Sequence, residues 1–158
     1  MRILVPSLLV FALGLCFATG TQAQYVQSPS ELAPGSAQLI NPEELVNRLQ
    51  STSGEKPVVL NVGPSILYMQ AHIPGAEYIG AGSDKQGLER LRTRVKSLPH
   101  DRLIFLYCGC CPWSHCPNVR PAYHELHAMG FTNVKVLYID HNFGSDWVDK
   151  GYPTIKGQ

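Results

Sequence analysis

The stretch that decides the fold is LIFLYC at residues 103–108, followed by GCCPWSHCPN at residues 109–118. Residues 103–107 form a continuous apolar run, which is typical of a buried strand in a parallel sheet. A helix is predicted after the cysteines, over residues 121–129, and Gly130 is expected to end it. Cys108 is therefore expected at the carboxyl end of a buried strand, where open α/β sheets bind their ligands.

Strands and helices alternate outward from this stretch. Further strands are predicted at residues 39–40, 57–62, 77–79 and 134–138, and further helices from Pro42, at residues 66–71, at residues 88–98 and around Trp147 and Val148. Asn41 is expected to cap the helix that begins at Pro42. This order predicts the α/β class, with a mainly parallel central sheet of about five strands flanked by helices.

The N-terminal segment is typical of an export signal. Arg2 precedes a short apolar run, and small residues at Thr21 and Ala23 suit a signal-peptidase site. We therefore predict a signal peptide at residues 1–23, a flexible lead-in rich in Pro, Ser and Gly at residues 24–37, and a single domain at residues 38–158. The apolar run is too short to favour a membrane span, so we expect none after cleavage and place the protein in the periplasm or outside the cell.

The charge of the chain excludes one class of partner. Its formal net charge is +1 at neutral pH, so it offers no basic field that would hold a polyanion. We therefore expect no nucleic-acid partner.

Cys108, Cys110, Cys111 and Cys116 are the cysteines outside the predicted signal peptide. A secreted fold stapled by disulfides spreads its cysteines along the chain, whereas a local cluster indicates redox chemistry, sulfur transfer or metal binding. A thiol between a strand end and a helix N-terminus is expected to have a lowered pKa. Of the four, Cys108 is the best placed for this effect.

Three interpretations of the remaining cysteines stay open. One of Cys110, Cys111 or Cys116 can act as a resolving thiol for Cys108 in an oxidising compartment. The cluster can instead bind copper or zinc, with His115 as a further ligand. The third interpretation is a plain structural disulfide, for example between Cys111 and Cys116.

Several stretches resemble the rhodanese-like family. Residues 71–76, AHIPGA, are similar to the family's G-H-I-P-G-A motif, and residues 106–108, LYC, resemble the strand that delivers the family's cysteine. Residues 41–45, NPEEL, resemble the family's opening step from strand to helix. Residues 129–134, MGFTNV, resemble the end of the helix that follows the cysteine and the start of the next strand. Within the first of these motifs, His72 is expected to hold its turn by hydrogen bonds.

The resemblance implies a sulfurtransferase of the thiosulfate or thiol type, with Cys108 as its catalytic residue. Cys108 would take sulfane sulfur from a small donor as a persulfide and pass it to a thiol or to cyanide, without a cofactor. Gly109, His115 and Arg120 would support the loop and the anionic intermediate that it holds, and a redox protein can be a further partner. A catalytically silent interaction module is the alternative outside enzyme chemistry.

The chain differs from the family pattern in two ways beside the predicted site. The family has Asp-x-Arg after its second strand, whereas this chain has Asn61-Val62-Gly63. The loop after Cys108 is also longer than in common members of the family.

Overall fold

The computed structural model describes residues 39–157. The predicted signal peptide, and the lead-in at residues 24–37, lie outside the described residues. Within residues 39–157, no helix is both long enough and apolar enough to cross a membrane.

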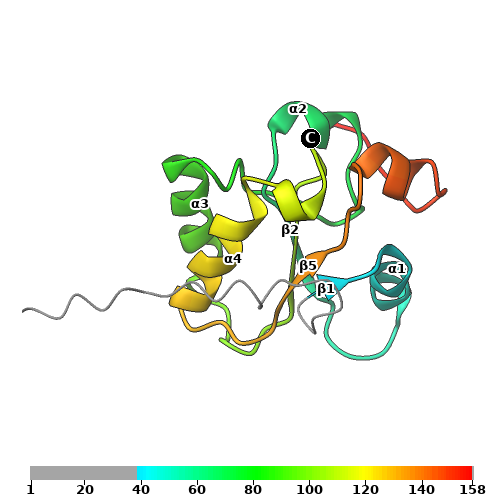
Figure 1. Ribbon diagram of the computed structural model, residues 1–158. Helices are drawn as coiled ribbons and strands as arrows, with labels where there is room; N and C mark the ends of the chain where they lie inside the picture. The colour runs from blue at the N-terminus through cyan, green and yellow to red at the C-terminus, as the bar shows by residue number, and fades with distance from the viewer. Residues whose placement is uncertain (1–38, 158) are drawn as a thin grey trace, which may run out of the picture.

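The described elements alternate along the chain as the sequence predicts (Figure 1). In order they are β1 Leu39–Ile40, α1 Pro42–Gln50, β2 Val58–Asn61, α2 Ser65–Gln70, β3 Glu77–Tyr78, α3 Lys85–Val95, β4 Ile104–Tyr107, the 3-10 turn η1 Trp113–His115, α4 Val119–Ala128, β5 Val134–Leu137 and the short helix η2 Gly144–Val148.

The strands form one five-stranded sheet in the order β1-β5-β4-β2-β3. Every pairing between them is parallel, which confirms the predicted class. The central strand β4 is buried at every position. Since parallel strands end at the same edge of a sheet, the residues that follow β2, β4 and β5 lie close to one another.

Alternate residues of the central strands build two apolar layers, one on each face of the sheet. Ile104 and Leu106 pack with residues of α3 and α4 on one face. Phe105 and Tyr107 pack on the other face, with residues of α1, α2 and η2. The residue after Tyr107 continues the alternation, and so Cys108 belongs to the α3 and α4 layer.

Helices α3 and α4 have boundaries that differ from the predictions. Helix α3 begins at Lys85 instead of residue 88 because Asp84 holds the extended conformation of an N-cap, and it ends at Val95 ahead of Pro99. Helix α4 begins at Val119, two residues before the predicted start. Pro121 fits in its first turn because the N–H groups there have no helical partner.

One predicted capping contact is also absent. Asn41 occupies the N-cap position of α1, but its side chain makes no capping hydrogen bond. Its carbonyl oxygen accepts the first helical bond, from the Leu45 N–H at 3.0 Å.

Candidate functional site

Cys108 lies directly after β4, as the sequence predicts, and is only 4 % exposed. Two residues at the end of the neighbouring strand β2 determine its place. The Asn61 Oδ1 accepts the Gly63 N–H at 3.0 Å, and the Asn61 Nδ2 donates to the Cys108 carbonyl oxygen at 3.4 Å. A Cβ at Gly63 would lie 2.5 Å from that oxygen and 3.0 Å from the Cys108 Sγ. The Asn-x-Gly sequence therefore leaves the room that Cys108 occupies.

Asn118 is the polar side chain aimed at the Cys108 sulfur. The Ser83 N–H donates to its Oδ1 at 3.1 Å, which leaves its Nδ2 to donate to the Cys108 Sγ at 3.3 Å. Asn118 is itself 4 % exposed, so this amide is fixed in position. A donor that faces sulfur favours a negatively charged sulfur over a neutral one.

The sulfur atoms gather around Cys108. The Sγ atoms of Cys108, Cys110 and Cys116 all lie within 4.8 Å of one another. The Cys108 and Cys110 Sγ atoms are 3.2 Å apart, and the Cys111 Sγ lies 3.0 Å from that of Cys110. All four described cysteines are free thiols.

The proton between Cys108 and Cys116 is shared unequally. The hydrogen bond with Cys116, together with burial, raises the pKa of Cys108 far above its ordinary value. The same bond, with backbone N–H groups of Asn118 and Val119, lowers the pKa of Cys116 to about 6. Burial raises the pKa of Cys111 to about 12, as does its contact with Cys110. The lowered pKa predicted for Cys108 is thus found at Cys116, because the Cys116 sulfur accepts the hydrogen bond from Cys108 and those of the two backbone N–H groups.

Three predicted supporting residues lie in different surroundings. Gly109 has a φ of +85°, and a Cβ there would lie 2.8 Å from the Cβ of Phe143, so only glycine fits. His115 is exposed, and its Nδ1 lies 2.9 Å from the Ser114 Oγ. The Arg120 Cζ lies 5.9 Å from the centre of the Trp113 ring, a cation–π contact that holds the turn. His115 and Arg120 therefore contact these neighbours in the turn.

A cavity opens beside the cysteines, with a volume of about 450 Å³. It lies between α2 and η2, and Gly109, Cys110 and Phe143 are among the residues that line it. The lining residues within the described chain include no lysine or arginine. Cys108 is not among the lining residues, but Cys110 is, and its Sγ lies 3.2 Å from that of Cys108.

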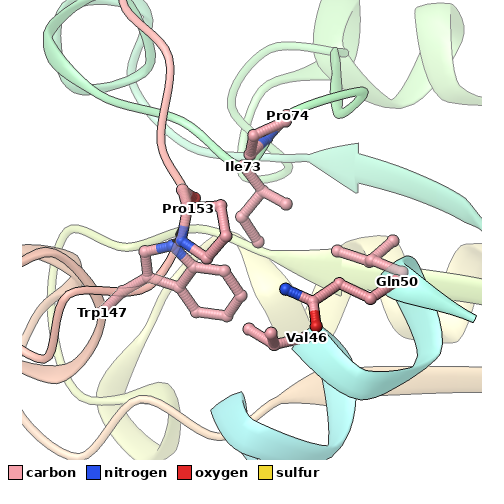
Figure 2. A pocket seen from close by; sticks show the side chains of 7 residues that line it. Val46, Gln50, Ile73, Pro74, Trp147 and Pro153 are labelled. Atoms are coloured by element: carbon pink, nitrogen blue, oxygen red, sulfur yellow. Dashed lines mark hydrogen bonds between the residues drawn. The ribbon is translucent and has the colours of Figure 1, made fainter.

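A second cavity, of about 180 Å³, lies against α1 (Figure 2). The Trp147 ring, Ile73 and Pro153 face one another across it, and Val46 and Gln50 of α1 form its floor. It is mostly apolar, and its lining in the described chain includes no cysteine. Its residues pack the turn at residues 72–75 against α1.

Comparison with known proteins places the chain in a family. Residues 41–138 match the family described as the rhodanese-like domain. The chain therefore belongs to the rhodanese-like domain family, as its motifs predict. No curated protein matches it.

Solved structures share the fold at low sequence identity. A crystal structure of the Alr3790 protein from Anabaena sp. is 24 % identical, with a TM-score of 0.57, over 75 % of this chain and 92 % of that one. The BH2092 protein from Bacillus halodurans is 21 % identical, with a TM-score of 0.56, over 74 % of this chain and 75 % of that one. Ygr203w from Saccharomyces cerevisiae is 22 % identical, with a TM-score of 0.53, over 77 % of this chain and 88 % of that one. Its structure is described as that of a homolog of single-domain rhodanese and the Cdc25 phosphatase catalytic domain.

Two polar contributors to the site are not predicted by the sequence patterns. Asn118 lies in the cysteine segment, but the sequence patterns assign it no role. Asn61 is noted only because Asn61-Val62-Gly63 stands where the family has Asp-x-Arg. Both asparagines are buried, and each lies at the end of a strand or directly before a helix, at the sheet edge. A polar residue at the end of a buried strand or before a helix is the sequence signal that could have identified both asparagines. Buried polar groups are normally hydrogen-bonded, so such a residue is expected to bind a neighbour.

Proposed function

We propose that this protein is a sulfurtransferase that carries sulfane sulfur as a persulfide on Cys108, and that it works in the periplasm or outside the cell. The observation that carries the proposal is the setting of the Cys108 Sγ. It follows the central strand, faces the Asn118 Nδ2 at 3.3 Å and lies within 4.8 Å of the Cys116 Sγ. The export signal predicted at residues 1–23 supports the location.

The contacts support a transfer in which Cys116 takes the proton. Cys108 attacks the outer sulfur of a persulfide donor, and its proton passes to the Cys116 thiolate. A new S–S bond forms on Cys108 while the donor's S–S bond breaks, so the donor leaves as a thiolate. The Asn118 N–H remains beside the sulfur that made the attack.

The second half of the reaction restores the cysteine pair. An acceptor thiolate attacks the outer sulfur of the Cys108 persulfide and becomes the new persulfide. Cys108 leaves as a thiolate and recovers the proton from Cys116. No net oxidation occurs, since one persulfide is exchanged for another.

The cavity beside Cys110 favours a thiol-borne donor over free thiosulfate. Its lining in the described chain is apolar or neutral, with Gln70 and Asn142 as polar residues. A dianion needs positive charge or several N–H groups where it binds. We therefore propose that donor and acceptor are both thiol compounds, which a redox partner protein can also supply.

Intact mass spectrometry of the reduced, mature protein tests the proposal. The protein is treated with an alkyl persulfide or with thiosulfate, alongside Cys108→Ser and the control Cys111→Ser. We expect wild type and the control to gain one sulfur atom that cyanide removes, more completely with the persulfide. A gain that survives in Cys108→Ser contradicts the assignment. No gain from either donor would leave a silent interaction module.

A further inference from the structure

The proposed transfer uses two of the clustered sulfurs and gives no role to Cys110. The Cys110 Sγ nevertheless lies 3.2 Å from that of Cys108, and all three Sγ atoms of Cys108, Cys110 and Cys116 are mutually within 4.8 Å. Three thiols converge at this one place although they come from separate points of the loop. Three convergent sulfurs can act together as ligands of one soft metal ion.

The composition of the cluster selects among soft metals. Among the described histidine, cysteine and carboxylate side chains, the group that can share an ion here contains these three sulfurs alone. His115 is exposed and lies against Ser114. Structural zinc sites have four protein ligands, whereas Cu(I) is a soft ion that thiolates select and that is stable with three of them in one plane. The ligand set therefore favours Cu(I) over zinc.

The surroundings already have the features of a supported metal site. The Asn118 Nδ2 donates to the Cys108 Sγ at 3.3 Å, and the Ser83 N–H fixes the orientation of that amide. Groups that hold metal ligands in this way commonly set the affinity of a site. Cys108 and Cys116 are 4 % and 3 % exposed, so two of the three sulfurs are shielded from water.

The cavity gives an ion access to the third sulfur. Cys110 is half-buried and lines the cavity of about 450 Å³. An ion carried by a small ligand can reach Cys110 first and then exchange onto the buried pair. A site with one accessible ligand and two buried ones suits transfer of the ion between carriers.

We propose that Cys108, Cys110 and Cys116 form a three-thiolate binding site for Cu(I). On binding, three S–Cu bonds form, the carrier ligand leaves, and each thiol that is protonated releases its proton to water, while copper stays Cu(I). The site shares Cys108 and Cys116 with the proposed sulfur transfer but does not depend on that activity. A bound ion occupies both sulfurs, so copper loading and persulfide formation exclude each other.

An anaerobic competition titration tests the site on reduced, mature protein that has met no sulfur donor. Cu(I) is supplied as its bicinchoninate complex, whose colour fades as the protein takes the ion. We expect one Cu(I) per chain. Replacement of a ligand, as in Cys110→Ser, should weaken binding by at least about a hundredfold, since loss of a supporting group alone costs about ten- to hundredfold. The matched control Cys111→Ser should stay within about threefold of wild type, since its thiol lies outside the group of three.

Three results would overturn the inference. The first is equal weakening by Cys111→Ser and Cys110→Ser, and the second is no removal of copper from bicinchoninate. The third is stoichiometric Zn²⁺ binding that His115→Ala weakens. Far-ultraviolet circular dichroism of each variant shows that it is folded, and half-buried Cys110 is the ligand least needed for packing. Persulfide formation without copper binding defeats this inference alone, and copper binding without a persulfide defeats the proposed function alone.

Discussion

The turn at residues 72–75 and the loop at residues 108–118 both meet the end of β4, the turn through the Ile73 N–H that donates to the Tyr107 hydroxyl at 3.3 Å, yet the two regions use their polar groups differently. In the turn, the His72 Nδ1 lies 2.9 Å from the Tyr68 carbonyl oxygen, and the two rings stack with centroids 3.8 Å apart. The Tyr68 hydroxyl donates to the Ala76 carbonyl oxygen at 2.7 Å. These contacts satisfy the polar groups of Tyr68 and His72 and stabilise the turn. They agree with the structural role predicted for His72.

The cysteine loop instead leaves reactive groups in contact with one another. The polar side-chain neighbours of Cys108 include two thiols and the Asn118 amide. Thiols are weak hydrogen-bond partners, so these contacts contribute little to stability. The comparison indicates that the turn stabilises the fold of this rhodanese-like chain, whereas the cysteine loop carries the chemistry under the proposed function. Substitutions in the two regions should therefore have separable effects.

The largest effect is expected at Gly63. Gly63→Ala would place a Cβ 3.0 Å from the Cys108 Sγ and 2.5 Å from its carbonyl oxygen. Overpacking of this kind costs about 1–3 kcal/mol and should displace Cys108. We expect a lower free energy of unfolding in urea and no detectable persulfide in the folded variant.

Gly75→Ala, in the turn, is the matched control. Gly75 has a φ of +79°, but no neighbouring atom lies within 4 Å of the position that an added Cβ would take, so alanine costs only backbone strain. That strain is about 1–2 kcal/mol. Persulfide formation should be unchanged at temperatures where the variant is folded. A loss equal to that of Gly63→Ala would contradict the division between scaffold and site.

His72→Ala is expected to affect stability alone. It removes a buried ring that both stacks and hydrogen-bonds, so the free energy of unfolding should fall by about 2–3 kcal/mol. Urea unfolding measures the loss, and mass spectrometry at low temperature measures the persulfide. A folded His72→Ala variant that forms no persulfide would show that His72 takes part in the chemistry.

Asn118→Asp is expected to slow the chemistry more than it lowers stability. The aspartate keeps an acceptor for the Ser83 N–H but turns a carboxylate oxygen toward the Cys108 sulfur in place of the N–H. Losing a hydrogen bond to a charged group costs about 1.5–3 kcal/mol, equivalent to roughly 10- to 100-fold in rate. The rate of persulfide formation measures this, and an unchanged rate would remove Asn118 from the mechanism.

The smallest effect concerns the pH dependence of Cys116. Its pKa is lowered to about 6 by the hydrogen bond with Cys108 and by backbone N–H groups. Because the thiolate is the reactive form, its fraction is nearly complete at neutral pH and falls as the pH drops through about 6. The ultraviolet absorbance of the thiolate, which needs no access for a reagent to this buried residue, should follow that profile and be lost in Cys116→Ser. A midpoint near the ordinary value for cysteine would contradict the proton sharing.

The fold could be predicted from the sequence because long apolar runs and turn residues specify it locally. The strand before Cys108, the order of elements and the parallel sheet are all confirmed. The helix start at Lys85 could not be predicted, because the polar first turn of α3 carries no apolar periodicity. The start of α4 is different, since buried Val119 and Ala122 have helical spacing and the prediction missed that signal.

The composition of the site could be predicted only in part. The sequence places four cysteines together, but the turn at η1 and the path of the loop decide which of them meet. That geometry brings Cys116 to Cys108 and leaves His115 exposed. The unequal pKa values of the two thiols follow from contacts across the loop, which sequence spacing does not determine.

The central claim is that sulfur is carried on Cys108, and site-resolved mass spectrometry tests it most directly. The persulfidated protein is alkylated, digested with trypsin and fragmented, so that the added sulfur is assigned within residues 103–135. We predict the sulfur on Cys108, with Cys110, Cys111 and Cys116 carrying only the alkyl group. Sulfur found on Cys116 or Cys110, with Cys108 unmodified, would contradict it.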